Sequence, residues 1–437
     1  MQKLRVQGRR AVLWTILILT TAGCGGSSTA ENPVPPPNES ATIKLTFWTP
    51  FSGGDGLYMV DLVKRYNQDN SGGVTVDLVN NKSEDYYTKL ATSIVTEEAP
   101  DVAIVHSSQF AQLAAAKFVD SIDGEAGRAG VRWEDYNPAI VRSTVLDGKH
   151  YAIPLDTHFY VMYYNKTWLK KAGLLSNEGK PLLGGGEAAF TDFLEKLRSR
   201  LPEETAPLAM PSVRIDAYWL WWSLYNQIEG GGTFYAADGR SPALNRTAAL
   251  RSLQYVDRLY KAGLIPPGIS DAVKLFSEGK AAVMFLGVWG TGIFEKMPGL
   301  DFGVAPLPVI YDRPASWGDS HTFAFPAKAS VSPEHRVAAI AFANWVAQHG
   351  ADWARAGHIP AALHAVESPD FRSLRYRSDY AAAADHVAYY PQGAKQGKVN
   401  LGAQKSFELM LAGQRTPEEV LDDLERYIGE ALKEAGR

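Results

Sequence analysis

Two tryptophans of this sequence stand where an apolar stretch ends, a place at which a side chain can face a ligand instead of a core. Trp289 comes just after Gly287 at the end of an apolar stretch, and Trp48 closes the alternating stretch that begins at Thr42. A flat indole ring can pack on the apolar C–H face of a sugar ring, whose hydroxyl rim then needs fixed donors and acceptors. We therefore interpret Trp289 as a platform for a sugar, whereas Trp48 fits either a platform or a core position.

Polar side chains that could hold sugar hydroxyls also follow the ends of extended stretches. Ser52 and Asp55 lie in the turn-rich loop after the first stretch, and His106 and Ser107 come directly after the apolar stretch 101–105. Ligands of open α/β sheets lie beyond the carboxyl ends of the strands, so these positions should border the ligand. Turn-forming Ser and Asp are common for backbone reasons alone, and a lone His is usually structural, so both alternatives stay open.

A further group of polar residues stands where the chain is expected to cross between two halves of the protein. Asp156 and His158 lie at the first proposed crossing, and Trp317, Asp319 and His321 lie at the second. A carboxylate that holds sugar hydroxyls makes short, charge-assisted hydrogen bonds, which favours Asp156 as a ligand contact. Polar residues near a hinge can instead satisfy backbone groups.

The segment 218–222 contains four aromatic residues. On a helix, at 100° per residue, Trp219 and Trp221 point about 160° apart, so these aromatics cannot all face one core. We consider Trp219 or Trp221 as a second platform. The alternative is a helix packed by aromatics that leaves one edge exposed.

The elements that position these residues follow from the periodicity of apolar side chains. The expected first elements are strands at 42–47, 74–79 and 101–105, with helices at 57–66, 86–96 and 110–118. This βαβ order implies a mostly parallel sheet. The next elements expected are extended runs at 151–156 and 157–164, and helices at 188–200, 217–227, 247–262, 333–347 and 417–435.

The N-terminus carries a targeting signal. Basic residues among the first ten precede an apolar stretch at 11–19, and small residues lead into Cys24, the only cysteine of the chain. We interpret 1–24 as a lipoprotein signal peptide with a lipobox, in which Cys24 is acylated, and 25–41 as a flexible tether. An uncleaved anchor helix is disfavoured because roughly 20 apolar residues are needed to span a bilayer.

Length and composition exclude several classes of protein. With 437 residues, the chain is long enough for two hydrophobic cores. A net charge of −4 without a basic cluster in the body argues against a nucleic-acid partner. With its one cysteine in the lipobox, the body has no catalytic thiol and no cysteine metal site. His358 and His364 are poorly spaced for one helix face, so we expect no metal and no cofactor.

Several short motifs follow one another along almost the whole body. They are LTFW at 45–48, APDV at 99–102, YAIP at 151–154, YNK at 164–166, AGL at 172–174 and FSEGKAAVMFLGVW at 276–289. In this order they resemble the extracellular solute-binding proteins of sugar-importing ABC systems, the group that includes the maltose-binding protein. In that family the position matching Trp289 stacks on sugar, and a segment matching His106 and Ser107 contacts it.

The resemblance implies a two-lobed α/β fold with hinge strands and a ligand cleft between the lobes. We expect lobe 1 at 42–155 plus about 322–365, and lobe 2 at 156–321 plus about 366–437. The implied function is capture of a small carbohydrate by hinge closure and its delivery to an ABC permease. The protein would be extracytoplasmic and bound to the cell membrane through its N-terminal lipid.

Other functions stay open. The same fold could bind a phosphorylated polyol, a polyamine or a peptide, although a phosphate favours Arg or helix N-termini and a polyamine favours several carboxylates. A secreted glycosidase would need a pair of carboxylates roughly 5 to 10 Å apart, and no such pair is recognisable in the sequence. We therefore expect no enzyme.

Overall fold

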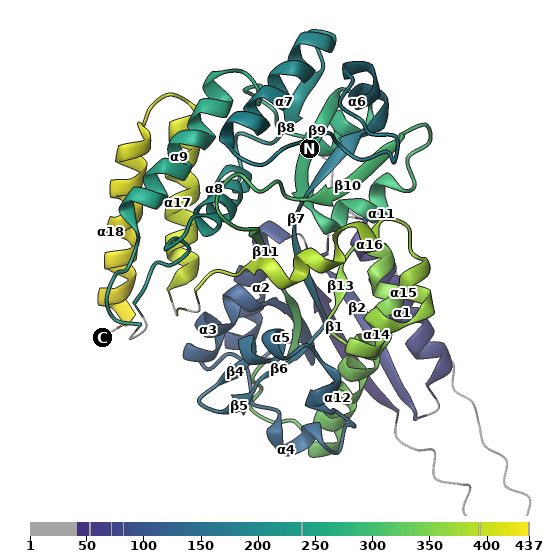
Figure 1. Cartoon of the computed structure of the whole chain (residues 1–437). Coiled ribbons are helices and arrows are strands. Elements are labelled where there is room, and N and C mark those ends of the chain that lie inside the picture. Colours follow the sequence, from purple (N-terminus) through teal and green to yellow (C-terminus); the bar gives the residue numbers. More distant parts are fainter. Residues whose placement is uncertain are drawn as a thin grey trace, which may run out of the picture. The chain divides into compact units, whose positions relative to one another are not determined.

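A computed structural model describes residues 42–51, 54–70, 72–81, 83–236, 239–391, 393 and 395–435. The expected signal peptide with Cys24, the tether at 25–41 and Ser52 lie outside these residues. The chain from Thr42 onward forms one compact unit. Within it, two large sheets with separate hydrophobic cores build two lobes (Figure 1).

The first sheet has the strand order β2-β1-β3-β12-β6. Its strands are β1 (Ile43–Thr49), β2 (Val74–Asn80), β3 (Val102–His106), β6 (Ala152–Pro154) and β12 (His321–Ala324). Strands β2 and β3 pair in parallel with β1, and β12 is antiparallel to both of its neighbours. The parallel βαβ order predicted from the periodicity is confirmed, with boundaries that differ by one to a few residues.

Helices cover this sheet on both faces. The longer ones are α1 (Asp55–Asp69), α2 (Ser83–Val95), α3 (Ser107–Ala115) and α12 (Pro333–Gln348). The shorter elements are α4 (Asp123–Ala126), η1 (Trp133–Asp135), α5 (Pro138–Ser143), β4 (Val145–Leu146), β5 (Lys149–His150), α13 (Gly350–Trp353), η3 (Ala354–Ala356) and α14 (Leu363–Glu367). Phe47 packs edge-on against Phe342 of α12 at 5.3 Å, and burying such a side chain contributes about 2 kcal/mol.

The APDV motif has a structural reason in this lobe. The carboxylate of Asp101 accepts hydrogen bonds from the backbone N–H and the hydroxyl of Thr46, at 2.7 and 3.0 Å. It also forms an ion pair with Lys328. It thereby fastens the start of β3 to β1. These interactions outweigh burial, which alone would raise the pKa, and they lower the pKa of Asp101.

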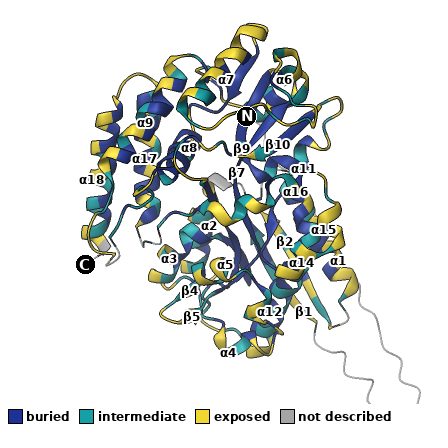
Figure 2. Cartoon of the chain, in the orientation of Figure 1, coloured by how far each residue is buried: buried dark blue, intermediate teal, exposed yellow. Residues whose placement is uncertain are grey.

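The second sheet is built around β7 (Asp156–Asn165), all of whose residues are buried (Figure 2). Its order is β14-β11-β7-β9-β8, with β10 and β13 also paired to β7. The other strands are β8 (Ala206–Ala209), β9 (Ala281–Gly287), β10 (Phe302–Pro306), β11 (Ser316–Asp319), β13 (Ile359–Pro360) and β14 (Val387–Ala388). Because β7 is covered on both faces, its middle residues 159–164 form a continuous aromatic and aliphatic run instead of alternating.

Helices of the second lobe pack against this sheet and against one another. They are α6 (Lys166–Ala172), α7 (Glu187–Arg200), α8 (Asp216–Gln227), α9 (Arg246–Lys261), α10 (Ala272–Ser277), η2 (Val288–Gly290), α11 (Thr291–Phe294), α15 (Pro369–Ser373), α16 (Arg377–Tyr380), η4 (Ala381–His386), α17 (Gln396–Leu411) and α18 (Pro417–Ala435). The YNK and AGL motifs delimit α6: Asn165 caps its first turn, and Gly173 ends it with a φ of 70°.

Strands of the first sheet come from 43–154 and 321–324, and strands of the second from 156–319 and 359–388. The exact lobe boundaries remain a prediction. What matters for the site is that the chain passes between the sheets at Leu155, at Ser320 and again before β13.

Candidate functional site

The crossings between the two sheets bring a group of buried polar residues together. Asp156 and His158 lie at the start of β7, and His321 opens β12 after the crossing at Ser320. His358 directly precedes β13, and Trp353 ends α13. We call Asp156, His158, His321, His358 and Trp353 the hinge cluster; at most 5% of any of the first four is exposed, and Trp353 is fully buried.

Asp156 is the centre of the hinge cluster. One of its oxygens accepts hydrogen bonds from the His158 ring at 3.1 Å and from the His321 backbone N–H at 3.2 Å. The other accepts from the His321 ring at 2.8 Å and from the Trp353 indole at 2.6 Å. A carboxylate has about four lone-pair sites, so these four donors leave none for a ligand in this conformation. The sequence predicted Asp156 as a ligand contact, whereas the structure gives it a full set of protein partners.

Burial and the interactions among these residues together set the protonation states in the hinge cluster. Burial by itself raises the pKa of Asp156, but interactions with His321 and His358 and the hydrogen bonds bring that pKa well below its ordinary value. Burial lowers the pKa of His321 to about 4 and that of His358 to about 3. At neutral pH the carboxylate is therefore an anion and both of these rings are neutral.

A second buried carboxylate joins the two sheets beside this cluster. One oxygen of Asp319, the last residue of β11, accepts from the Ser107 hydroxyl at 2.6 Å and from the backbone N–H groups of Ser108 and Ser320 at 3.1 and 2.8 Å. His106, the last residue of β3, bonds the Tyr87 hydroxyl through its ring at 2.6 Å. Of the polar residues predicted from the sequence, the structure brings together His106, Ser107, Asp156, His158, Asp319 and His321.

Three indoles of the second lobe form an aromatic wall next to the hinge cluster. Trp219 and Trp317 stack face to face at 3.8 Å, and Trp289 stands edge-on to both with centroids 6.3 Å away. Trp289 also lies 5.7 Å from the ring of His158. Trp219 and Trp289 are half-buried, whereas Trp317 is buried, and its indole N–H has no acceptor among the described residues. The wall therefore offers partly accessible ring surface and one unpaired donor.

Gly287 determines the position of Trp289. A Cβ atom at Gly287 would lie 1.8 Å from the Trp289 ring, so the ring folds back over backbone that carries no side chain. Gly357, just before His358, also has no room for a side chain. Its φ is 125°, and a Cβ there would lie 1.9 Å from the Val288 carbonyl oxygen. Both sides of the site thus depend on a glycine at a close backbone approach.

On α8, Trp219 and Trp221 point to different sides of the helix, as an angle of 100° per residue requires. Trp221 and Trp222 are fully buried in the second-lobe core, and their indole N–H groups donate to the Ala249 and Ala388 carbonyls at 3.0 and 2.9 Å. Trp221 therefore has no ring surface for a ligand, and of the two candidate platforms on this helix only Trp219 reaches the wall.

The remaining predicted positions lie elsewhere in lobe 1. The half-buried Trp48 packs against a small core group that includes Tyr86 and Phe110, and Asp55 accepts a hydrogen bond from the Gly56 N–H at the start of α1. Both stay predictions. Sequence reasoning missed Trp353, Tyr87 and the part played by His358. The local sequence around His358, a Gly-His pair before Ile359 and Pro360, gives no pattern that marks it as part of a site.

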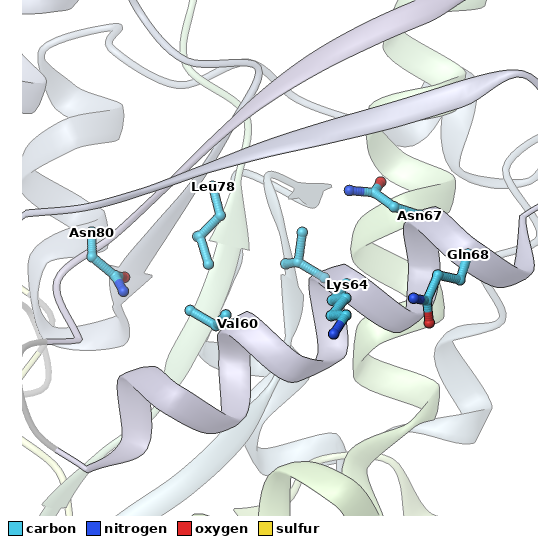
Figure 3. Close-up of a pocket in the computed structure, with 7 residues that line it drawn as sticks. Val60, Lys64, Asn67, Gln68, Leu78 and Asn80 are labelled. Atoms are coloured by element: carbon cyan, nitrogen blue, oxygen red, sulfur yellow. The ribbon is translucent and has the colours of Figure 1, made fainter.

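A groove of about 460 Å³ lies elsewhere, between α1 and β2 (Figure 3). Its lining consists of Val60, Val63, Lys64, Asn67, Gln68, Leu78 and Asn80. It contains none of the residues predicted to bind a ligand, and it has no aromatic ring. We therefore place the candidate site at the aromatic wall.

Comparison with known proteins gives consistent matches. A family model described as bacterial extracellular solute-binding protein matches residues 52–353. The chain is 23% identical over 368 residues to the maltotriose-binding protein of Pyrococcus abyssi, which covers 82% of this chain and 76% of that protein. No helix in the described part of the chain is long and apolar enough to cross a membrane.

Two solved structures share the fold. The GacH receptor of Streptomyces glaucescens, solved without ligand and with acarbose, superposes with a TM-score of 0.78 at 19% identity, covering 89% of this chain and 98% of that one. UgpB of Mycobacterium tuberculosis, solved with glycerophosphocholine, gives a TM-score of 0.78 at 17% identity, covering 90% and 99%. The two-lobed α/β fold predicted from the sequence is confirmed.

Proposed function

The chain belongs to the family of bacterial extracellular solute-binding proteins, and we propose that it captures a neutral saccharide on the aromatic wall for delivery to an ABC permease. The observation that carries this proposal is the wall itself, in which the half-buried rings of Trp219 and Trp289 stand beside buried Trp317 at the junction of the sheets. Ring faces suit the C–H faces of a sugar, and the unpaired Trp317 N–H suits a hydroxyl acceptor.

The site favours a neutral ligand over a phosphorylated one. Two buried carboxylates, Asp156 and Asp319, lie next to the wall and both have lowered pKa values. Their negative charge would repel a phosphate, although the fold is shared with a protein solved with glycerophosphocholine. The maltotriose-binding relative supports an oligosaccharide as the ligand. We propose binding without hydrolysis.

Capture proceeds through the hinge. The saccharide binds the wall on the second lobe, and rotation about the three crossings brings His106 of the first lobe toward it. The contacts made only in the closed state supply the free energy that shifts the population toward closure. The permease recognises that closed state. The N-terminal residues, with Cys24 acylated, tether the protein to the outer face of the cell membrane.

The test is a ligand screen on the full chain. Thermal shift is measured with mono-, di- and oligosaccharides, and with glycerophosphocholine and spermidine as non-sugar ligands, because a specific binder raises the melting temperature by mass action. Each hit is titrated by calorimetry into wild type and Trp289→Ala. Loss of one stacked ring is expected to cost about 2 kcal/mol, a roughly thirtyfold weaker Kd.

Trp133→Ala is the matched control. Trp133 is also partly buried, but it stacks on His150 at 4.0 Å in the first lobe. Its variant is expected to bind the saccharide as wild type does. A hit that Trp289→Ala and Trp133→Ala bind equally well would remove the wall from the proposal. Binding of glycerophosphocholine alone would overturn the saccharide, and release of shorter sugars during the titration would make the protein an enzyme.

A further inference from the structure

Three histidines at the junction present their rings to one another. His106 and His321 are directly paired in the register of β3 and β12, and their rings lie 4.6 Å apart. The ring of His158 lies 4.2 Å from that of His321 and 5.6 Å from that of His106. One ring nitrogen of each residue lies within 4.8 Å of the other two. This is close enough for one ion to reach all three after small rotations of the rings.

Each of the three rings is held from behind through its Nδ1 atom. The Nδ1 atoms of His158 and His321 each bond a carboxylate oxygen of Asp156, at 3.1 and 2.8 Å, and that of His106 bonds the Tyr87 hydroxyl at 2.6 Å. Metal-binding histidines are typically oriented in this way, with one nitrogen on a carboxylate or another oxygen and the opposite nitrogen on the metal. In the described part of the chain the hydrogen bonds of all three rings are made through Nδ1, so an ion would be bound through Nε2.

We propose that His106, His158 and His321 form a three-histidine site for a divalent transition metal, Zn²⁺ in the first place, which bridges the two lobes. Imidazole nitrogen suits Zn²⁺, and three protein ligands leave a fourth position for water or a ligand hydroxyl. His106 and His321 belong to the first sheet and His158 to the second. A bound ion would therefore tie the two sheets to each other at the hinge. This inference does not depend on which solute the wall binds.

The charge around the three rings favours a cation. Two buried carboxylates flank them: Asp156 touches two of the rings, and Asp319 interacts electrostatically with His106 and His158. Buried negative charge needs a partner, and a dication supplies one.

A second set of possible ligands overlaps the first. Asp156, His321 and His358 also have ligand atoms within 4.8 Å of one another, and neither ring nitrogen of His358 has a hydrogen-bond partner in the described part of the chain. Binding there would break the bond between His321 Nδ1 and Asp156, whose lone pairs are already filled. His106 is also less buried than His358, which gives an ion a path from solvent to the three-histidine set.

The test is metal titration of the full chain in the absence of any solute. Protein stripped with EDTA and dialysed is titrated with ZnCl₂ by calorimetry, and Co²⁺ is added separately to record its visible absorption. One equivalent of Zn²⁺ is expected to bind, with a Co²⁺ spectrum typical of tetrahedral nitrogen coordination. His106→Gln and His158→Gln are each expected to weaken Zn²⁺ binding by at least about a hundredfold, and Tyr87→Phe by about tenfold.

His386→Gln, at an exposed histidine outside the cluster, is the control and should bind Zn²⁺ as wild type does. Circular dichroism of each metal-free variant reports whether it folds. His106→Gln is the decisive variant because its half-buried ring bonds only Tyr87 among the described residues, so it should fold. Absence of Zn²⁺ binding to wild type, or an unchanged affinity in His106→Gln, overturns the proposal. Loss of binding in His358→Gln with retention in His106→Gln would assign the ion to the second set instead.

Discussion

Asp156 at the centre of the hinge cluster and Trp317 in the aromatic wall are both buried but differ in whether their polar atoms are paired. In the hinge cluster, Asp156 has four donors on its two oxygens. In the wall, the N–H of Trp317 has no acceptor among the described residues, and two of the three indoles keep some exposed surface. A carboxylate with four protein donors holds protein segments together, whereas an unpaired donor beside half-buried rings suits a ligand acceptor. The difference assigns Asp156 to the hinge and the wall to solute binding.

Removing the centre of the hinge cluster should have the largest effect. Asp156→Ala leaves four buried donors unpaired, and breaking a buried, hydrogen-bonded network in this way costs about 3–5 kcal/mol of unfolding free energy. Urea unfolding measures the loss. Asp69→Ala, which breaks an exposed pair with Arg65, is expected to change stability by at most about 1 kcal/mol. A variant of Asp156 that stays as stable as wild type but loses its solute would return Asp156 to the ligand site.

Acid should weaken the junction formed by the hinge cluster and the neighbouring His106 before it affects the wall. The pKa values of His106 and His321 are lowered from 6.5 to about 4, so between these values the unfolded chain binds more protons than the folded one. Stability present above pH 6.5 is therefore lost as the pH falls toward 4, by up to about 3 kcal/mol for each ring. Urea unfolding in EDTA from pH 7.5 to 4 measures this loss. In His106→Gln the slope should be shallower, and an equal slope would contradict the assignment.

Substituting the two tryptophans of α8 one at a time distinguishes an effect on binding from an effect on stability. Trp219→Ala removes a ring of the wall and is expected to weaken saccharide binding by about 2 kcal/mol, a roughly thirtyfold change in Kd. Trp221→Phe alters a fully buried ring, so it should lower the free energy of unfolding by about 1–2 kcal/mol and leave Kd unchanged. Calorimetry and urea unfolding of both variants measure the two effects. A weaker Kd in Trp221→Phe would show that the wall extends into the core.

Much of this could be predicted from local sequence. The strand and helix periods gave the parallel βαβ order, and Gly287 with Trp289 marked the end of an apolar strand. The roles that could not be predicted depend on contacts between residues that are distant in the sequence. The bonds of Asp156 to His321 and Trp353 span 165 and 197 residues, so no spacing rule could reveal that its oxygens are filled.

The two tryptophans of α8 illustrate the same limit in a single helix. The angle of 100° per residue predicts that Trp219 and Trp221 face apart, but it does not say which of them faces the core. That choice depends on α9 and on the position of Trp317, which comes almost a hundred residues later. His358 depends on the third crossing, whose strand β13 has only two residues and therefore almost no pattern of its own.

The smallest expected effect comes from one methyl group behind the wall. Gly287→Ala places a Cβ 1.8 Å from the Trp289 ring, so the ring must turn away while the hinge cluster keeps all its hydrogen bonds. We expect about tenfold weaker saccharide binding, or about 1.4 kcal/mol, and a change of only about 1 kcal/mol in unfolding. Calorimetry and urea unfolding of the same preparation measure both. Gly429→Ala is the control, because a Cβ at that position of α18 meets nothing within 4 Å. If Gly287→Ala binds as tightly as wild type, the orientation of Trp289 is not what the ligand recognises, and the wall would then contribute through Trp219 and Trp317 alone.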